Sequence, residues 1–99
     1  VGEREPLRLR RAWRTSPEQV LAPPVLSPDG ELACVPLHGP TPGLFVVAPQ
    51  GAPRRLTEGR DYDPRWNDRH ILFYRLEQQA GSASHETRTR LLHVERPAA

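Results

Sequence analysis

The fold is decided by the stretch Pro24-Val25-Leu26-Ser27-Pro28-Asp29-Gly30-Glu31-Leu32-Ala33-Cys34-Val35. A short apolar segment ends at Leu26 and is followed by four residues typical of a turn. Proline presets φ, aspartate accepts a hydrogen bond from the backbone that follows, and glycine accepts positive φ. The apolar run over residues 32–35 then predicts a strand that is buried on both faces. Together these signals predict a tight β-hairpin.

A second stretch has the same order of parts, Pro64-Arg65-Trp66-Asn67-Asp68-Arg69-His70-Ile71-Leu72-Phe73-Tyr74. Trp66 ends its first strand, Asn67-Asp68 is its turn, and residues 71–74 are its apolar run. The prolines lie 40 residues apart and the apolar runs 39 apart, which predicts a second turn one residue shorter than the first. A repeat of about 40–45 residues made of short strands is typical of β-propeller blades.

The flanking residues extend each hairpin into a larger unit. After the first copy, residues 36–43 predict a short stiff connection, 44–48 a strand, 49–53 a turn and 54–57 an outer strand. After the second, residues 78–84 are small and polar and predict a mobile hairpin tip, while 90–94 resemble the strand at 44–48. Residues 6–14 alternate like a half-exposed strand and predict the outer strand of a preceding unit.

The expected fold is therefore all-β, with two tandem four-stranded antiparallel blades of a partial propeller. Residues 1–22 form an arginine-rich lead-in, 23–59 the first repeat, and 60–99 a second repeat without its outer strand. Two blades leave strand edges and apolar faces open, whereas propellers have four to eight blades. Further blades of a longer chain, or other copies of this chain, are thus expected as neighbours, with a self-contained sandwich as the alternative architecture.

These residues resemble the TolB-type β-propeller repeat, a bacterial relative of the WD repeat. The resemblance covers roughly residues 23–95 and rests on an ordered series of motifs: Ser27-Pro28-Asp29-Gly30, Leu44-Phe45-Val46-Val47, Arg54-Arg55-Leu56-Thr57-Glu58-Gly59 and Asp63-Pro64-Arg65-Trp66. It implies a periplasmic or cell-envelope location and a non-catalytic role as a scaffold that binds another protein. The alternative is a propeller segment that controls substrate access in a larger serine peptidase, with its catalytic residues outside this chain.

Composition excludes several other classes. The chain has 99 residues, 12 of them proline, which argues against a helical bundle. No apolar run approaches 18 residues, so no membrane-spanning helix is expected. A single cysteine, Cys34, cannot form an internal disulfide. The net charge of +2 is small, and a nucleic-acid-binding arm over the N-terminal arginines is the less favoured interpretation of that basic stretch.

No pattern in the sequence predicts catalysis, a metal or a cofactor. The four histidines and Cys34 lack zinc-site spacing. Ser84-His85-Glu86 are adjacent in sequence, whereas a catalytic triad converges from separate elements. The acidic residues around Asp61 lack the pattern of a calcium loop and are interpreted as capping turns.

The candidate partner-binding residues are Tyr62, Arg65 and Trp66, since aromatic residues and arginine dominate binding hot spots. For Trp66 packing between the blades is the favoured role and partner binding the alternative, whereas for Tyr62 the sequence leaves both roles open. The residues assigned to the structural turns are Ser27, Pro28, Asp29, Gly30, Asn67 and Asp68.

Overall fold

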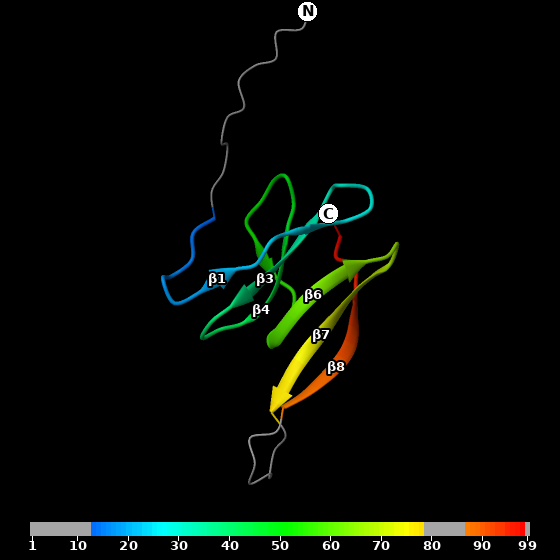
Figure 1. Ribbon diagram of the computed structural model, residues 1–99. Coiled ribbons are helices and arrows are strands. Elements are labelled where there is room, and N and C mark those ends of the chain that lie inside the picture. The colour runs from blue at the N-terminus through cyan, green and yellow to red at the C-terminus, as the bar shows by residue number, and fades with distance from the viewer. Residues whose placement is uncertain (1–12, 79–86, 99) are drawn as a thin grey trace, which may run out of the picture.

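A computed structural model describes residues 13–78 and 87–98 of the chain. Every regular element in these ranges is a β-strand, and the strands form two antiparallel sheets (Figure 1). The all-β class predicted from the sequence is thus confirmed. These ranges contain no helix long and apolar enough to cross a membrane. Two predictions, the N-terminal strand at 6–14 and the loop at 78–84, fall almost wholly outside the described residues.

The first sheet, sheet A, contains the strands β1 (Val20–Leu21), β2 (Val25–Leu26), β3 (Ala33–His38), β4 (Gly43–Val47) and β5 (Arg54–Arg55). Strand β3 is central, with β4 on one side and both short strands β1 and β2 on the other. Strand β5 then pairs with the outer side of β4. Sheet A therefore follows the chain as a simple meander whose first strand is interrupted.

The prolines explain that interruption. Residues 22–24 are Ala-Pro-Pro, and they separate β1 from β2 opposite the middle of β3. Pro36 lies within β3, and its carbonyl accepts a hydrogen bond from Ala22 on this side. The missing N–H of Pro36 faces the break, where proline costs no ladder bond. The predicted connection at 36–43 is thus wrong at both ends, because only residues 39–42 form the turn.

The second sheet, sheet B, contains β6 (Arg60–Trp66), β7 (His70–Gln78) and β8 (Thr87–Glu95) in chain order. Figure 1 shows these three strands running side by side. A bulge interrupts the β6–β7 register between Tyr62 and Arg65. Within it Asp63 has a φ of 51°, a left-handed conformation that aspartate tolerates better than most residues. The bulge reverses which face each following side chain occupies.

The hydrophobic core lies between the two sheets. Its fully buried members come from both sheets and from the turn before β3: Leu32, Cys34, Leu44, Val46, Ile71 and Phe73. Trp66, Leu92 and Val94 of sheet B pack against this group. Because directly paired residues share a face, each sheet has an inner face toward this core and an outer face away from it. Burial of apolar area here is the main stabilising contribution.

The two hairpins correspond through their turns, but at a different offset from the predicted one. Ser27 donates its N–H to the Leu32 carbonyl at 2.8 Å, and Asn67 donates its N–H to the His70 carbonyl at 2.9 Å. The next pairs outward, Leu26 with Ala33 and Trp66 with Ile71, therefore correspond. The second strands of the hairpins lie 38 residues apart, so the expected 39 is wrong by one residue. A shift of one residue exchanges the two faces of a strand.

This exchange explains how the sheets pack. Cys34 faces the core from sheet A, whereas its counterpart Leu72 faces outward from sheet B. Ile71 and Phe73 occupy the inner face of sheet B instead. The prediction that residues 71–74 are buried on both faces is therefore wrong, because Tyr74 on the outer face is 36% exposed. The first apolar run is buried on both faces, as predicted, with Cys34 0% and Val35 8% exposed.

The turn residues act as the sequence predicted. The Ser27 hydroxyl donates to Asp29 Oδ1 at 2.6 Å and accepts the N–H of Leu32 at 3.0 Å. Gly30 has a φ of 73°, which glycine adopts without strain. Pro28 and Asp29 form the exposed tip of this turn. These contacts close the hairpin before β3 begins.

The second turn uses a side chain in the same way. Asn67 Oδ1 accepts the N–H of Arg69 at 2.9 Å and that of His70 at 2.7 Å. Asp68 is exposed at the tip. Because only residues 68 and 69 remain between the bonded pair, this turn is two residues shorter than the first.

Asp29 makes the stability of this fold sensitive to acid. Hydrogen bonds from Ser27 and Glu31, with a further contribution from Arg96, lower the pKa of Asp29 to about 2. Because this pKa lies below the ordinary value of 3.8, Asp29 stabilises the folded state above about pH 4, and this contribution is lost as pH falls through 2. We expect the urea midpoint to fall less between pH 6 and pH 2.5 in Asp29→Asn than in the wild-type chain. Asp68→Asn, at the other turn, should retain the wild-type difference, and an equal difference in Asp29→Asn would contradict this role.

Candidate protein-binding face and adjacent cavities

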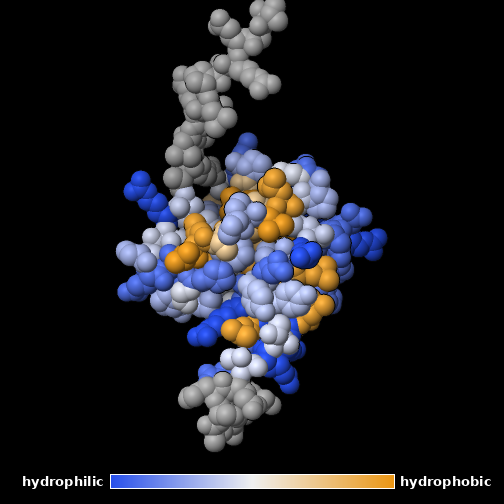
Figure 2. Space-filling view, viewed as in Figure 1, coloured by the Kyte–Doolittle hydropathy of each residue, from blue (hydrophilic) through white to orange (hydrophobic). Residues whose placement is uncertain are grey.

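The outer face of sheet B carries an exposed apolar surface. Tyr62 and Tyr74 are cross-strand partners whose rings stack with centroids 5.8 Å apart. Leu91 pairs with Tyr74 from β8 and is 60% exposed. We call the surface formed by Tyr62, Leu72, Tyr74 and Leu91 the outer patch. Figure 2 shows apolar side chains in separate patches among hydrophilic ones on the side of the molecule that it presents.

The three candidate residues on β6 do not share one face. Tyr62 and Arg65 both pair with outer-face residues of β7, Tyr74 and Leu72 respectively. Trp66 pairs with the buried Ile71 and therefore lies on the inner face. In a regular strand Tyr62 and Trp66 would share a face, since they are four positions apart. The bulge at Asp63 and Pro64 moves Trp66 inward.

Trp66 joins the two sheets. Its indole N–H donates to the Val25 carbonyl of β2 at 2.7 Å. Arg96, just beyond β8, lies over the indole ring at 5.7 Å and donates to Asp29 Oδ2 at 2.6 Å. These hydrogen bonds connect sheet B to strand β2 and to the turn that follows it. Of the two roles considered for Trp66, these contacts are those of packing between sheets, the role that the sequence favoured.

Tyr74 and Leu91 were not among the binding residues predicted from the sequence. Tyr74 belongs to an apolar run that was expected to be buried on both faces. Leu91 lies on β8, and the face that it occupies depends on the β7–β8 register, which could not be read from the sequence. Once the β7–β8 pairing is known, the alternation Thr89, Leu91, His93 marks the outer face of β8. The sequence shows that these three residues alternate, but only the register shows which face they occupy.

A buried ion pair holds β6 against β7. Asp61 is 0% exposed, and its two carboxylate oxygens accept hydrogen bonds from Arg75 Nε at 2.7 Å and from a terminal guanidinium nitrogen at 3.0 Å. The bonds that Arg75 donates to Asp61 raise the pKa of this guanidinium above its ordinary value. Asp61 was expected to cap a turn, and its ion pair with Arg75 shows that this interpretation was wrong.

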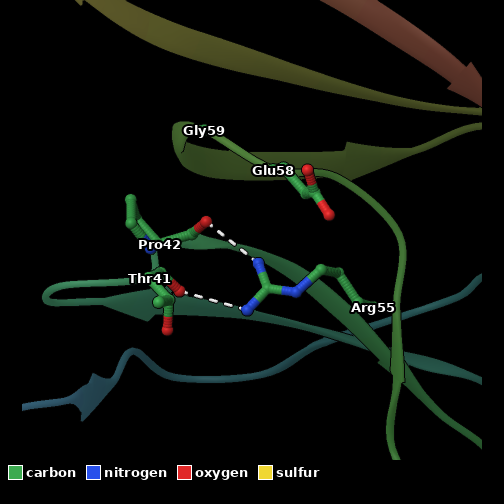
Figure 3. A pocket seen from close by; sticks show the side chains of 5 residues that line it. All are labelled: Thr41, Pro42, Arg55, Glu58 and Gly59. Carbon is green, nitrogen blue, oxygen red and sulfur yellow. Dashed lines mark hydrogen bonds between the residues drawn. The ribbon is translucent and has the colours of Figure 1, made fainter.

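Arg55 fixes the β3–β4 turn at one end of the molecule. Its guanidinium donates to the carbonyls of Thr41 at 3.2 Å, Pro42 at 3.0 Å and Thr57 at 3.2 Å, and lies over the Phe45 ring at 4.6 Å. Figure 3 shows the guanidinium directed at the carbonyls of Thr41 and Pro42. The cavity drawn there has a volume of about 420 Å³. Because its arginine is already engaged, this cavity offers a ligand no uncommitted cation, and its other charged side chain is the exposed Glu58.

A second cavity of about 420 Å³ opens on the other side of Pro42. Its lining consists of His38, Gly39, Pro42, Arg60, Tyr62 and Leu76. We call it the turn cavity. It shares Tyr62 with the outer patch, so the two features adjoin.

Among residues 13–78 and 87–98, the other potentially reactive side chains include Cys34 and the pair His70 and His93. Cys34 is fully buried, and burial raises the pKa of its thiol to about 12, which keeps it protonated and unreactive. His70 and His93 make an edge-to-face contact with centroids 5.0 Å apart. In the described part of the chain no three histidine, cysteine, aspartate or glutamate residues gather in a way that suits a metal ion.

Comparison of the chain with protein-family models, with curated proteins and with solved structures gave no significant match.

Proposed function

We propose that this chain is a non-catalytic protein-interaction module built from two propeller-type blades, and that its outer patch receives a partner. The observation that carries the proposal is the correspondence between the sheets. The outer face of sheet B is the counterpart of the inner face of sheet A, which is buried in the same molecule.

Individual residues support this correspondence. Cys34, Leu44 and Val46 on sheet A are 0%, 0% and 2% exposed beneath sheet B. Their counterparts through the matched hairpin pairs are Leu72, Leu91 and His93. Leu91 is 60% exposed, whereas Leu44 is fully buried. A face of this repeat that is covered in one copy is thus uncovered in the other.

The outer face of sheet A differs from the outer face of sheet B in how far it is covered. On the outer face of sheet A, Trp13 packs against Phe45 with ring centroids 5.0 Å apart. Leu37 on that face is only 2% exposed. Sheet A is therefore largely covered by its own chain, and the outer patch of sheet B is the face that supports partner binding.

The class of partner is inferred from the way in which sheet B covers the inner face of sheet A. Sheet B presents the apolar side chains of Ile71, Phe73 and Trp66 to sheet A. The partner proposed for the outer patch is accordingly a protein that presents an antiparallel sheet with a similar apolar face. Scaffolding in a bacterial cell envelope is the setting that the TolB-type resemblance implies.

A charge placed in the outer patch is expected to weaken association. Burial of a leucine contributes about 1.5–3 kcal/mol, so Leu91→Arg should raise the concentration needed for self-association by roughly 10–100-fold. Light scattering over a concentration series measures this on the chain itself, with a second copy as the available apolar sheet. Circular dichroism on the same samples checks that the fold is retained.

Val20→Arg is the matched control, because Val20 is 61% exposed but lies on β1 of sheet A and is not part of the outer patch. It should associate as the wild-type chain does. A wild-type chain that remains monomeric at every concentration, or equal effects of the two substitutions, would contradict a binding role for the outer patch.

A further inference from the structure

We infer that the turn cavity binds a carboxylate group carried beside an apolar or aromatic group. This goes beyond the proposed function, because it assigns a ligand chemistry to a site other than the outer patch. The cavity forms where three elements converge: the β3–β4 turn, the start of β6 and the end of β7.

The polar groups of the cavity are uncommitted hydrogen-bond donors. Arg60 is exposed, and its guanidinium has no hydrogen-bond or ion-pair partner among the described residues. The Tyr62 hydroxyl and the His38 ring likewise have no such partner in the described part of the chain. None of the six lining residues is acidic. The site thus offers positive charge and hydrogen-bond donors without an internal acceptor.

Asp61 and Glu77, the acidic residues next in sequence to Arg60 and Leu76, are both paired with arginines. Asp61 is fully buried and bound through both oxygens by Arg75. Glu77 accepts a hydrogen bond from Arg90 at 3.0 Å. Neither carboxylate is therefore available to Arg60. Glu58, two positions before Arg60, is exposed and forms no ion pair with it among the described residues, so the guanidinium is free to pair with an external anion. A carboxylate matches the planar guanidinium with two parallel hydrogen bonds.

The wall opposite Arg60 is rigid before any ligand binds. Gly39 has a φ of 136°, and a Cβ there would lie 2.6 Å from the carbonyl oxygen of Glu18. Thr41 donates its N–H to the Gln19 side chain at 3.4 Å, and Arg55 holds the carbonyls of Thr41 and Pro42. A fixed turn costs little ordering entropy on binding.

The apolar part of the ligand is expected beside Pro42, Leu76 and the Tyr62 ring. The Tyr62 ring is supported from behind by its stack on Tyr74. A volume of about 420 Å³ lies within the usual range for small-ligand sites, about 300–1,000 Å³. The combination of a fixed aromatic wall and one free guanidinium suits an arylacetate or an acidic side chain next to an aromatic one.

The test is a pair of titrations followed by NMR of the full chain. Phenylacetate is expected to shift the amide of Gly39 and the side chain of Arg60 with saturation at millimolar concentration. Phenylacetamide has the same ring without the charge, and inorganic phosphate has charge without a ring. Each should bind at least tenfold more weakly, and equal binding of either would overturn the inference.

Arg60→Gln should weaken phenylacetate binding at least tenfold, since charge-assisted hydrogen bonds are the stronger class. The control is Arg65→Gln on the same strand, whose arginine has only a 3.8 Å contact with Asp63 and lies outside the cavity. It should bind phenylacetate as the wild-type chain does. An unchanged affinity in Arg60→Gln, with the fold intact by NMR, would overturn the assignment.

A terminally blocked peptide with glutamate beside phenylalanine distinguishes the two sources of this chemistry. If it binds at least as tightly as phenylacetate and loses binding in Arg60→Gln, the carboxylate comes from a protein partner. If only phenylacetate binds in this Arg60-dependent way, the ligand is a small free acid. Binding of neither would contradict the inference, while leaving the outer patch and its association test unaffected.

Discussion

Replacement of Arg75 by methionine is expected to lower the free energy of unfolding by about 3–5 kcal/mol, the range observed when one partner of a buried ion pair is removed. The reason is the environment of Asp61, which is 0% exposed. Without Arg75 its carboxylate loses two hydrogen bonds and its counter-charge. Urea unfolding monitored by circular dichroism measures the change, which should appear in the midpoint rather than the slope.

The reverse substitution should cost less. In Asp61→Asn the remaining charge belongs to Arg75, whose side chain is 27% exposed and can reach water. The double variant Asp61→Asn/Arg75→Met contains no buried charge and should recover much of the loss caused by Arg75→Met alone. A double variant that recovers none of the loss would show that the contact of the Arg75 guanidinium with the Phe73 ring, which both variants lack, rather than charge burial, governs this position.

The turns could be predicted from sequence because their chemistry is local. Ser27, Asp29 and Gly30 close the first hairpin with bonds to residues no more than five positions away. Asn67 closes the second turn with its own side chain. Such residues carry their conformational preference wherever they occur. The meander order of the strands then follows from short connections between neighbours.

Which side chains of sheet B point toward the core could not be predicted, because a shift of one residue along a strand reverses the face that each side chain occupies. The second turn is two residues shorter than the first, and the bulge at Asp63 adds a residue within β6. The bulge exchanges the inner and outer side chains that follow it. The second turn is one residue shorter than the spacing of the apolar runs predicts, which exchanges the faces expected for β7. The apolar run at 71–74 contains no signal of its own for which side would be covered, since all four residues are apolar.

The candidate sites were likewise predicted only where they depend on single residues and not where they depend on contacts between distant segments. Tyr62 and Arg65 were selected by residue type, and they lie on the outer face. The turn cavity was not foreseen, because it joins His38 to Arg60 and Leu76, which lie far apart along the chain. The hydrogen bonds from Arg55 that fix its wall also link distant segments. Only tertiary structure brings such residues together.

Trp66→Ala is expected to destabilise the chain by about 3–5 kcal/mol, the usual cost of removing a packed tryptophan. Trp66 packs against the core, donates to the Val25 carbonyl and supports Arg96, so its loss loosens the contact between the sheets. Trp66→Phe keeps an aromatic ring and should lose about 0.5–1.5 kcal/mol with the hydrogen bond. Urea unfolding followed by circular dichroism measures both variants.

Leu26→Ala is the matched comparison, because Leu26 occupies the position in the first hairpin that Trp66 occupies in the second. Leu26 is 64% exposed on the outer face of sheet A, so its truncation should change stability by no more than about 0.5 kcal/mol. The same repeat position thus carries a large energy in one sheet and almost none in the other, because only one of the two faces meets a neighbouring sheet. Equal losses at Leu26 and Trp66 would mean that both faces are covered in solution, and the assignment of inner and outer faces would then be wrong.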